Sequence, residues 1–285
     1  MGAERQSLRG APKFFSKTCG VILLFFVCAM PQISHAGAWN LPKNEGQVII
    51  TGAFTNGNSI FDDDGNRQDA DFSKTETRVF FEHGLADRWT LVSNAAFQMS
   101  QFQDGSVEGG GSFNFDDFDD VEFGLRYQIK REDDRAISLQ GSYIIDGGPA
   151  DNILDIGGGR DAVELRLLWG QSYQSERWGE LFFDAQLAGR LRTDSGEYDS
   201  TRADLTLGIK PKPKWFVFLQ NFGTLREEES DMGFFVSEQA QFKSTLSAGY
   251  EYKQGRAVQI GYSETLFGRN IVKERGVFLS TWIRY

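Results

Sequence analysis

The chain has 285 residues, of which 30 are lysine or arginine and 40 are aspartate or glutamate, and its formal net charge is −10. This acidic balance argues against nucleic acid as a partner, because binding a phosphate backbone requires a basic surface. The two cysteines, Cys19 and Cys28, both lie near the N-terminus. The rest of the chain therefore has neither a disulfide framework nor a catalytic thiol.

The first 36 residues have the order of a secretory signal peptide: a basic stretch, an apolar run and a site of small residues. Lys13 and Lys17 end the basic stretch, residues 21–30 form the apolar run, and Ser34-His35-Ala36 is the expected cleavage site. The run is too short to span a bilayer as a helix. The sequence therefore predicts a signal peptide at 1–36 and a single domain at 37–285.

After the expected cleavage site, apolar and polar residues alternate with a period of two, which is the pattern of a strand with two different faces. Twelve such segments follow one another: 46–55, 74–84, 89–101, 120–130, 135–145, 161–172, 179–192, 201–210, 215–223, 240–252, 256–266 and 276–285. The chain is therefore predicted to be all-β, a transmembrane antiparallel up-and-down β-barrel of about 12 strands, with 10 or 14 as alternatives.

The connections between these segments alternate in length. Short turns follow the even-numbered segments, at 85–88, 131–134, 174–177, 211–214 and 253–255. Long stretches follow the odd-numbered ones, at 56–73, 102–119, 146–160, 193–200, 224–239 and 267–275. The long stretches are rich in Gly, Asp, Asn and Ser, which favour loops. This arrangement is typical of outer-membrane barrels, whose short turns face the periplasm and whose long loops lie outside the cell.

Aromatic residues gather near the strand ends that carry the short turns. They are Trp89, Trp169, Trp178, Trp215, Trp282, Tyr127, Tyr173, Tyr250, Tyr252 and Tyr285. Indole and phenol rings favour the headgroup level of a bilayer, where one part of the ring is apolar and another can hydrogen-bond. In a soluble lipocalin-like or sandwich protein, which is the alternative fold, the same residues would scatter along the strands. Their placement favours the membrane barrel.

The last strand ends the chain on an aromatic residue. Its apolar face carries Val277, Leu279, Thr281, Ile283 and Tyr285. This pattern resembles the C-terminal signal strand of bacterial outer-membrane barrels, which the outer-membrane assembly machinery reads. Because an even number of strands brings both ends to the same rim, we expect this strand to close the barrel against residues 46–55.

The strand pattern and both terminal segments resemble Gram-negative outer-membrane β-barrel proteins of the porin-like kind over the whole chain. The resemblance implies a location in the bacterial outer membrane, in contact with its lipid and lipopolysaccharide. Two shorter stretches, Gly37–Val48 and the turn Glu82–Arg88, resemble a group of barrels called XagA-like. That second resemblance implies a surface protein linked to adhesion or biofilm.

The faces opposite the apolar ones carry ionisable residues of both signs, which we predict to line the barrel interior. They are Glu76, Arg78, Glu82, Glu122, Arg126, Glu164, Arg166, Asp184, Arg190, Arg202, Asp204, Lys243, Glu251 and Glu264. One interpretation is a water-filled path for small solutes, and the other is an interior filled by salt-bridged side chains or plugged by a loop. A barrel of twelve strands lies between the filled eight-stranded and the open sixteen-stranded cases.

The long loops are acidic, with Asp62, Asp63, Asp64, Asp69 and Asp71 in the first, Asp104, Glu108, Asp116, Asp117, Asp119 and Asp120 in the second, and Glu227, Glu228, Glu229 and Asp231 in the fifth. Divalent cations are conceivable partners, because Ca²⁺ and Mg²⁺ prefer oxygen ligands. The spacing does not match a calcium-binding loop, and a solvated loop of like charges that repel one another explains the composition better. We therefore predict no metal site and no cofactor.

The sequence gives no support for an enzyme. The one histidine after the expected cleavage site, His83, lies at the expected periplasmic end of a strand, whereas catalytic sites of barrel enzymes face the outer leaflet or the outside. We therefore expect a porin-like channel that passes small solutes passively through a charged lumen. The alternative is a non-conducting surface protein, linked to adhesion or biofilm, that acts through its acidic loops.

Overall fold

A computed structural model describes residues 37–104, 111–118, 120–145, 161–193, 198–226 and 239–285. The predicted signal peptide at 1–36 lies outside the described residues, as do the whole loop at 146–160, Glu108 and Asp119 of the second loop, and the fifth-loop acids at 227–231. None of the described residues forms a helix that is long and apolar enough to cross a membrane.

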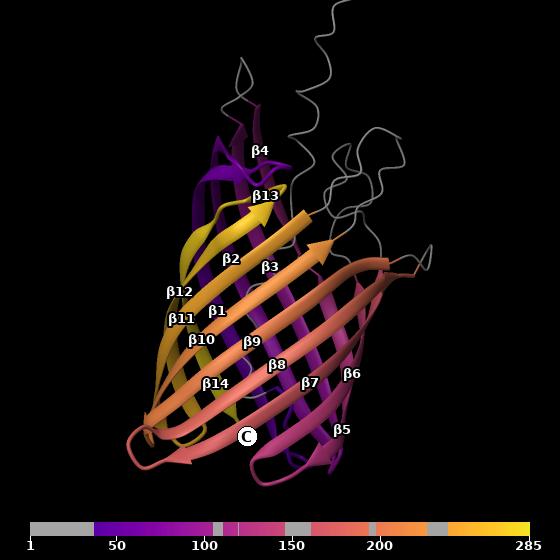
Figure 1. The fold of residues 1–285 in the computed structure, drawn as a ribbon, viewed down its shortest axis with the longest axis vertical. Coiled ribbons are helices and arrows are strands. Elements are labelled where there is room, and N and C mark those ends of the chain that lie inside the picture. The colour runs from indigo at the N-terminus through magenta and orange to yellow at the C-terminus, as the bar shows by residue number, and fades with distance from the viewer. Residues whose placement is uncertain (1–36, 105–110, 119, 146–160, 194–197, 227–238) are drawn as a thin grey trace, which may run out of the picture.

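Twelve long strands of the described residues form one closed antiparallel sheet (Figure 1). They are β1 (Gly46–Phe61), β2 (Arg67–Ala86), β3 (Trp89–Asp104), β5 (Val121–Arg131), β6 (Arg135–Ile145), β7 (Ala162–Ser175), β8 (Gly179–Arg192), β9 (Tyr198–Lys212), β10 (Trp215–Arg226), β11 (Gln239–Lys253), β12 (Arg256–Arg269) and β14 (Arg275–Arg284). Two shorter strands, β4 (Gly111–Phe118) and β13 (Ile271–Val272), pair with β3 and β1. The prediction of an all-β barrel of about 12 strands is therefore confirmed.

The barrel closes where the first strand meets the last. β14 pairs with β1 in a register that runs from Gln47 opposite Arg284 to Asn56 opposite Arg275, and its other edge pairs with β12. Among the described residues, each of the twelve long strands thus has a partner on both sides, which is the condition for crossing hydrocarbon with strands. The predicted pairing of the C-terminal strand with residues 46–55 is confirmed.

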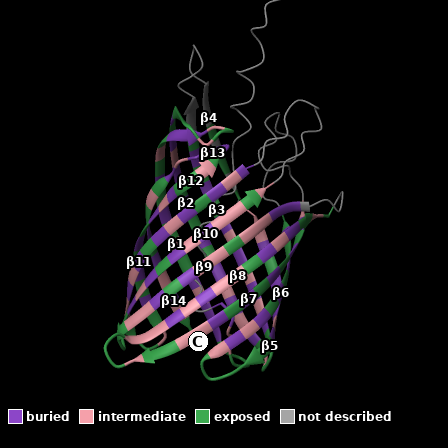
Figure 2. Cartoon of the chain, viewed as in Figure 1, coloured by how far each residue is buried: buried purple, intermediate pink, exposed green. Residues whose placement is uncertain are grey.

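Each strand presents an apolar face outward and a mostly polar face inward, which appears as alternating bands of exposed and buried residues in Figure 2. On the outside, Leu165 is 58% exposed, Leu279 is 60% exposed and Ile260 is 63% exposed. A protein surrounded by water rarely shows so many large apolar side chains in one continuous band. The outer surface is instead matched to lipid, and the polar face is buried inside the barrel.

Several stretches that we expected to be loops are strands. β1 continues to Phe61 and β2 begins at Arg67, so the expected loop at 56–73 shrinks to a turn of residues 62–66. Likewise β3, β4, β12 and β13 take up most of the described parts of 102–119 and 267–275. Gly, Asp and Asn residues weaken an isolated strand, but neighbouring strands already paired in the barrel supply the partners that extend these ones.

The aromatic rim is confirmed except at one residue. Trp89 and Tyr127 pack with ring centroids 4.8 Å apart, and Trp215 and Tyr250 with centroids 4.9 Å apart, at the ends of the strands that carry the short turns. Trp282 differs, because it is only 1% exposed and lies on the inner face of β14. Along β14, Trp282 alternates with the apolar residues that face outward, so its ring packs inside the barrel.

If lipid surrounds the outer surface, a charged residue placed on its apolar band should lower the stability of the protein. Replacing Leu165 by arginine is expected to lower the free energy of unfolding in lipid by about 2–4 kcal/mol, because the charge would sit in the middle of the apolar band. Replacing Tyr173, which is 67% exposed near the rim, by arginine is expected to cost about 0–1 kcal/mol. Urea titrations of both variants in lipid vesicles measure the difference. Equal, small costs would contradict a bilayer around this face.

Candidate functional site

The structure places most of the predicted lumen residues inside the barrel. Glu76, Arg78, Glu82, Glu122, Arg126, Glu164, Arg166, Asp184, Arg190 and Lys243 are each at most 8% exposed. Arg202, Asp204 and Glu251 are half-buried on the inward faces of β9 and β11. The barrel interior is therefore the candidate site, and it brings together residues that are far apart in the sequence.

Glu264 does not belong to this interior set. It lies two residues after Tyr262 on β12, on the same outward face, and its carboxylate accepts a hydrogen bond from the Tyr262 hydroxyl at 3.2 Å. Lys273 is its ion-pair partner at 3.5 Å. The expectation that Glu264 faces the lumen is wrong, because the alternation of β12 continues unbroken from Val258 through Glu264.

One network of charges joins β7, β8 and β9. The carboxylate of Glu164 lies 2.8 Å from Arg166 and 3.4 Å from Arg190. Arg166 also reaches Asp204 at 2.5 Å, and Arg190 reaches Asp120 at 2.7 Å. Because each arginine bridges two acids, these side chains line the wall in a fixed arrangement and do not act as independent charges.

Two further groups of charges line other parts of the wall. Arg126 lies 2.8 Å from Glu82 and donates to the Gln140 side-chain oxygen at 3.0 and 3.1 Å. On β2, Glu76 lies 2.9 Å from Arg78 and 3.5 Å from Lys74. Lys243 of β11 forms an ion pair with Glu274, which also lies 3.9 Å from Lys74.

Sequence reasoning missed some members of these groups. Lys74 and Glu274 are both 1% exposed and belong to the interior. Lys74 has the same parity as Glu76 on β2, and that alternation was the signal available for it. Glu274 had no such signal, because it lies between β13 and β14 in a stretch expected to be a loop.

Part of the interior wall is aromatic, which the sequence analysis also missed. Phe182, Phe216, Phe218, Phe278 and Trp282 are at most 6% exposed and pack in one cluster. Ring centroids are 5.3 Å apart for Phe182 and Phe218, and 5.8 Å apart for Phe216 and Trp282. The indole nitrogen of Trp282 donates to the side-chain oxygen of Gln259 at 2.9 Å. This apolar wall lies on strands β8, β10 and β14.

A segment ahead of the first strand, residues 37–45, turns back into the barrel. The turn is closed by a hydrogen bond from the Glu45 amide to the Pro42 carbonyl at 3.0 Å, with Asn44 in the left-handed region at φ 66°. Asparagine tolerates that conformation better than most residues do. The amide of Asn44 donates to the carbonyl of Gly84 at 2.8 Å, and a Cβ on Gly84 would lie 2.1 Å from the Pro42 oxygen. Glycine at 84 is therefore required for the close approach.

Beyond this turn, the segment contacts the inner faces of β5 to β8. The Ala38 amide donates to Asp184 at 3.1 Å, and the Ala38 carbonyl accepts from Gln128 at 3.2 Å and Ser138 at 2.5 Å. Ala38 is fully buried and Asn40 is 3% exposed. The segment therefore fills part of the lumen near the rim that carries the short turns.

Trp39 anchors the segment. Its ring lies against Gly170 of β7, where an added Cβ would come within 2.1 Å of a ring carbon. The same ring packs on a small apolar cluster of Ala38, Ala136 and Leu168. Because only glycine leaves space for the indole at this position, the inner face of β7 is shaped to receive Trp39.

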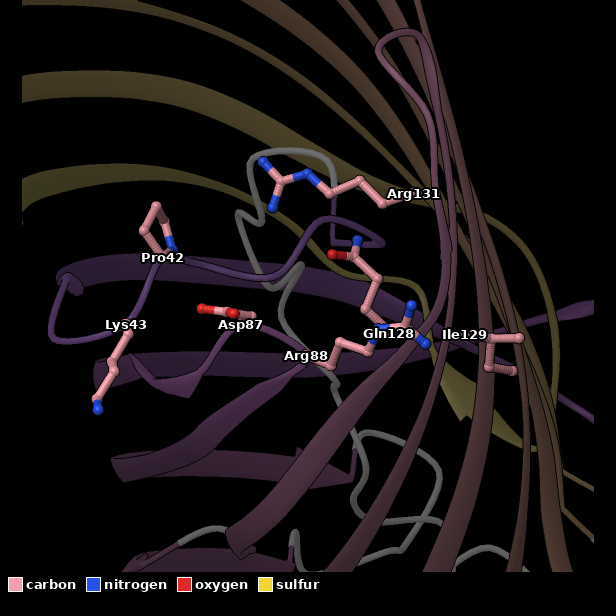
Figure 3. A pocket seen from close by; sticks show the side chains of 7 residues that line it. All are labelled: Pro42, Lys43, Asp87, Arg88, Gln128, Ile129 and Arg131. Carbon is pink, nitrogen blue, oxygen red and sulfur yellow. The ribbon is translucent and has the colours of Figure 1, made fainter.

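A cavity of about 390 Å³ opens between this segment and the barrel wall. Figure 3 shows Pro42 and Lys43 on one side of it, Arg131 of β5 on the other, and Asp87, Arg88 and Gln128 between them. Ile129 points away from it, in keeping with its outward position on the strand (Figure 3). The cavity is a hollow with side chains of both charges at the short-turn rim.

His83 lies at the same rim. Its Nδ1 is 3.5 Å from the hydroxyl of Tyr285, and the two rings stack with centroids 6.1 Å apart. This contact joins β2 to the last residue of the chain across the beginning of β1. The histidine thus belongs to the seam where the barrel closes.

The first acidic stretch forms a compact turn. The carboxylate of Asp62 accepts from the Asn66 amide at 2.8 Å, the Asp64 amide at 3.0 Å and the Gln68 side chain at 3.0 Å. These hydrogen bonds hold the pKa of Asp62 below its usual value, and the one from Gln68 has the largest effect. Within the part of the chain that the structure describes, no three acidic or histidine side chains are grouped as a metal site requires.

No protein-family model matches the chain, and no curated protein matches it in sequence. Solved structures are similar to it in fold. The COG4313 outer membrane channel from Pseudomonas putida F1 has a TM-score of 0.68 at 15% identity, over 89% of this chain and 100% of that one. The NanC porin has a TM-score of 0.52 at 12% identity, over 83% and 98%. The translocator domain of the autotransporter NalP from Neisseria meningitidis has a TM-score of 0.50 at 12% identity, over 87% and 91%.

The closed antiparallel sheet, the apolar outer band and the polar interior define the class of this protein: it is a bacterial outer-membrane β-barrel. The lipid of that membrane surrounds its outer face. Its fold is that of the channel and porin structures named above.

Proposed function

We propose that the protein is a porin-like channel, through which small solutes cross the outer membrane passively along a charged lumen. Fold alone does not assign this activity, since barrels of one architecture serve several functions. The support comes from the interior, where paired carboxylates and guanidinium groups line the wall and make it strongly polar.

The observation that carries the proposal is the set of buried polar atoms with no partner in the described part of the protein. They include the hydroxyls of Thr90, Ser100 and Thr245, the side-chain oxygen of Asn94 and two guanidinium nitrogens of Arg202. Each such group would cost about 1–3 kcal/mol in a dry interior. All of them lie on inward faces, so we infer that water fills the space between the charged walls.

The segment at 37–45 narrows the path at one end. It lies against β5 to β8, while the aromatic cluster covers the inner faces of β8, β10 and β14. Between them, solutes would pass a constriction that is apolar on one side and hydrogen-bonding on the other. We propose that this constriction limits the size of what crosses and that the charged networks beyond it select by charge.

Conductance of the purified protein in a planar lipid bilayer tests the proposal. We expect discrete current steps, and we expect Arg190→Glu to shift ion selectivity toward cations by roughly twofold or more, because it replaces a lumen cation with an anion. Lys253→Glu is the matched control, since Lys253 is exposed at the end of β11, and it should leave selectivity unchanged.

A folded protein that gives no current steps would overturn the channel proposal. That result would favour the non-conducting surface protein, whose role would rest on the parts of the acidic loops outside the cell. Current steps whose selectivity is the same in Arg190→Glu and wild type would place the conducting path away from the charged network of β7, β8 and β9.

A further inference from the structure

Asp184 is a buried lumen carboxylate with no cation within 4 Å of it among the described residues. It is 2% exposed, and its two oxygens accept from the Gln186 side chain at 2.7 Å and from the Ala38 amide at 3.1 Å. The comparable interior acids Glu82 and Glu164 each lie within 4 Å of an arginine. A buried carboxylate held only by neutral donors is costly, because the charge is removed from bulk water without compensation.

The structure brings the start of the predicted mature chain to this carboxylate. Gly37 is buried, and its neighbour Ala38 is fixed by one hydrogen bond that its amide donates and two that its carbonyl oxygen accepts. The nitrogens of consecutive residues are separated by less than the ~3.8 Å between adjacent Cα atoms. Because the nitrogen of Ala38 lies 3.1 Å from Asp184, the nitrogen of Gly37 lies no more than about 7 Å from that carboxylate, a separation that a rotation of the terminal residue can close.

We infer that Asp184 is a binding site for the α-ammonium group of Gly37, which exists only after the chain is cut between Ala36 and Gly37. The cut is a hydrolysis: one water is consumed, the peptide bond breaks, Ala36 gains a carboxylate and Gly37 gains an ammonium. Before the cut, the nitrogen of Gly37 is a neutral amide. After it, the nitrogen is positively charged and pairs with the carboxylate of Asp184.

Because this ion pair forms only after the signal peptide is removed, that removal changes how the N-terminal segment is held in the lumen. The contacts of Ala38 and Trp39 place the segment, and the ion pair adds a charged bond at its tip. The processed N-terminus is thereby held in the barrel interior and protected from reagents in solution. The inference concerns the chain's own end and does not depend on whether the barrel conducts.

Chemical labelling of the terminal amine tests the inference in the full processed protein folded in detergent. Intact mass should place the N-terminus at Gly37. Acetylation by a water-soluble succinimidyl ester, followed on the N-terminal peptide by mass spectrometry, should be at least about tenfold slower in wild type than in Asp184→Asn. The asparagine removes the charge and keeps one acceptor oxygen for the Ala38 amide, while its NH2 group replaces the oxygen that accepts from Gln186.

Two further variants keep the test decisive. Asp199→Asn removes another buried lumen carboxylate, one held by Arg192 and Arg226, and should leave the amine as protected as in wild type. Inserting Gly-Ser after Ala36 moves the amine up to about 7 Å along the chain and should expose it even though Asp184 is intact. This insertion variant serves as the test if Asp184→Asn does not fold.

The inference is overturned if intact mass places the N-terminus elsewhere. It is also overturned if the amine of wild type reacts as fast as that of Asp184→Asn or of the insertion variant. A failure of the channel proposal would appear as absent current steps with the amine still protected, so the two outcomes are distinguishable.

Discussion

Replacing Gly170 by valine is expected to raise the single-channel conductance by roughly twofold or more. The valine side chain would occupy the space that the Trp39 ring now fills, and the displaced segment would free part of the lumen. A Cβ at this position would lie 2.1 Å from the indole ring, so the ring must leave. Its departure removes the apolar contact with Ala136 and Leu168 and leaves the segment at 37–45 attached to the wall mainly through Ala38. Planar bilayer recordings measure the effect.

Gly141→Val is the matched control for this prediction. Gly141 lies on β6, next to β7, but it faces outward, and an added Cβ there meets nothing within 4 Å. Its conductance should equal that of wild type. If Gly170→Val and Gly141→Val conduct equally, the segment does not obstruct the path. Near-ultraviolet circular dichroism of Gly170→Val should meanwhile report the loss of fixed packing around Trp39.

The parts of the fold that could be predicted from the sequence are those set by a strict period of two. In β5, Phe123 and Leu125 meet lipid while Glu122 and Arg126 face the interior, and every residue of the strand is constrained by one environment or the other. A shift by one residue would reverse all of them. Strand number, order and closure follow from such segments and from the short turns between them.

Strand length beyond the clearly alternating segments was less predictable. Residues 56–61 and 67–73 are rich in Gly, Asp, Asn and Ser, so the two-residue alternation is weak in the sequence, although Ile60, Phe61 and Phe72 are buried in the structure. Their pairing is determined by the neighbouring strands already in register. For the same reason Glu274, which lies beside β14 outside the alternating part, gave no sign of its ion pair with Lys243.

The interior site was predictable in its charges but not in what occupies it. The inward position of Arg126 or Arg190 follows from parity alone. The segment at 37–45 has no periodicity, and its path depends on contacts with Gly84 and Gly170, which lie about 40 and 130 residues further along the chain. The aromatic wall is an intermediate case, because Phe216 and Phe218 break the polar pattern of the inner face of β10 in a way that the sequence shows.

Removing Tyr285 is expected to reduce the amount of assembled barrel in the outer membrane by about tenfold, while weakening the stability of the folded protein much less. The backbone of Tyr285 forms the last pair of hydrogen bonds in the closing seam, donating to Gly46 at 3.0 Å and accepting from it at 2.8 Å. Losing both costs about 1–3 kcal/mol. The larger effect in cells would follow from our proposal that the assembly machinery reads the outward face of β14, which carries Val277, Leu279, Thr281, Ile283 and Tyr285.

The comparison that separates these two effects is assembly in cells against refolding in detergent, each followed by the change in gel mobility on heating. Tyr285→Phe is the control: it keeps the aromatic ring and both backbone bonds and loses only the hydroxyl contact with His83 at 3.5 Å, so it should assemble like wild type. If the chain lacking Tyr285 refolds in detergent but fails in cells, the terminal ring acts in recognition as well as in closure. Normal assembly of that chain in cells would show that the seam between β1 and β14 forms without its final residue, and that the proposed recognition does not depend on the terminal aromatic ring.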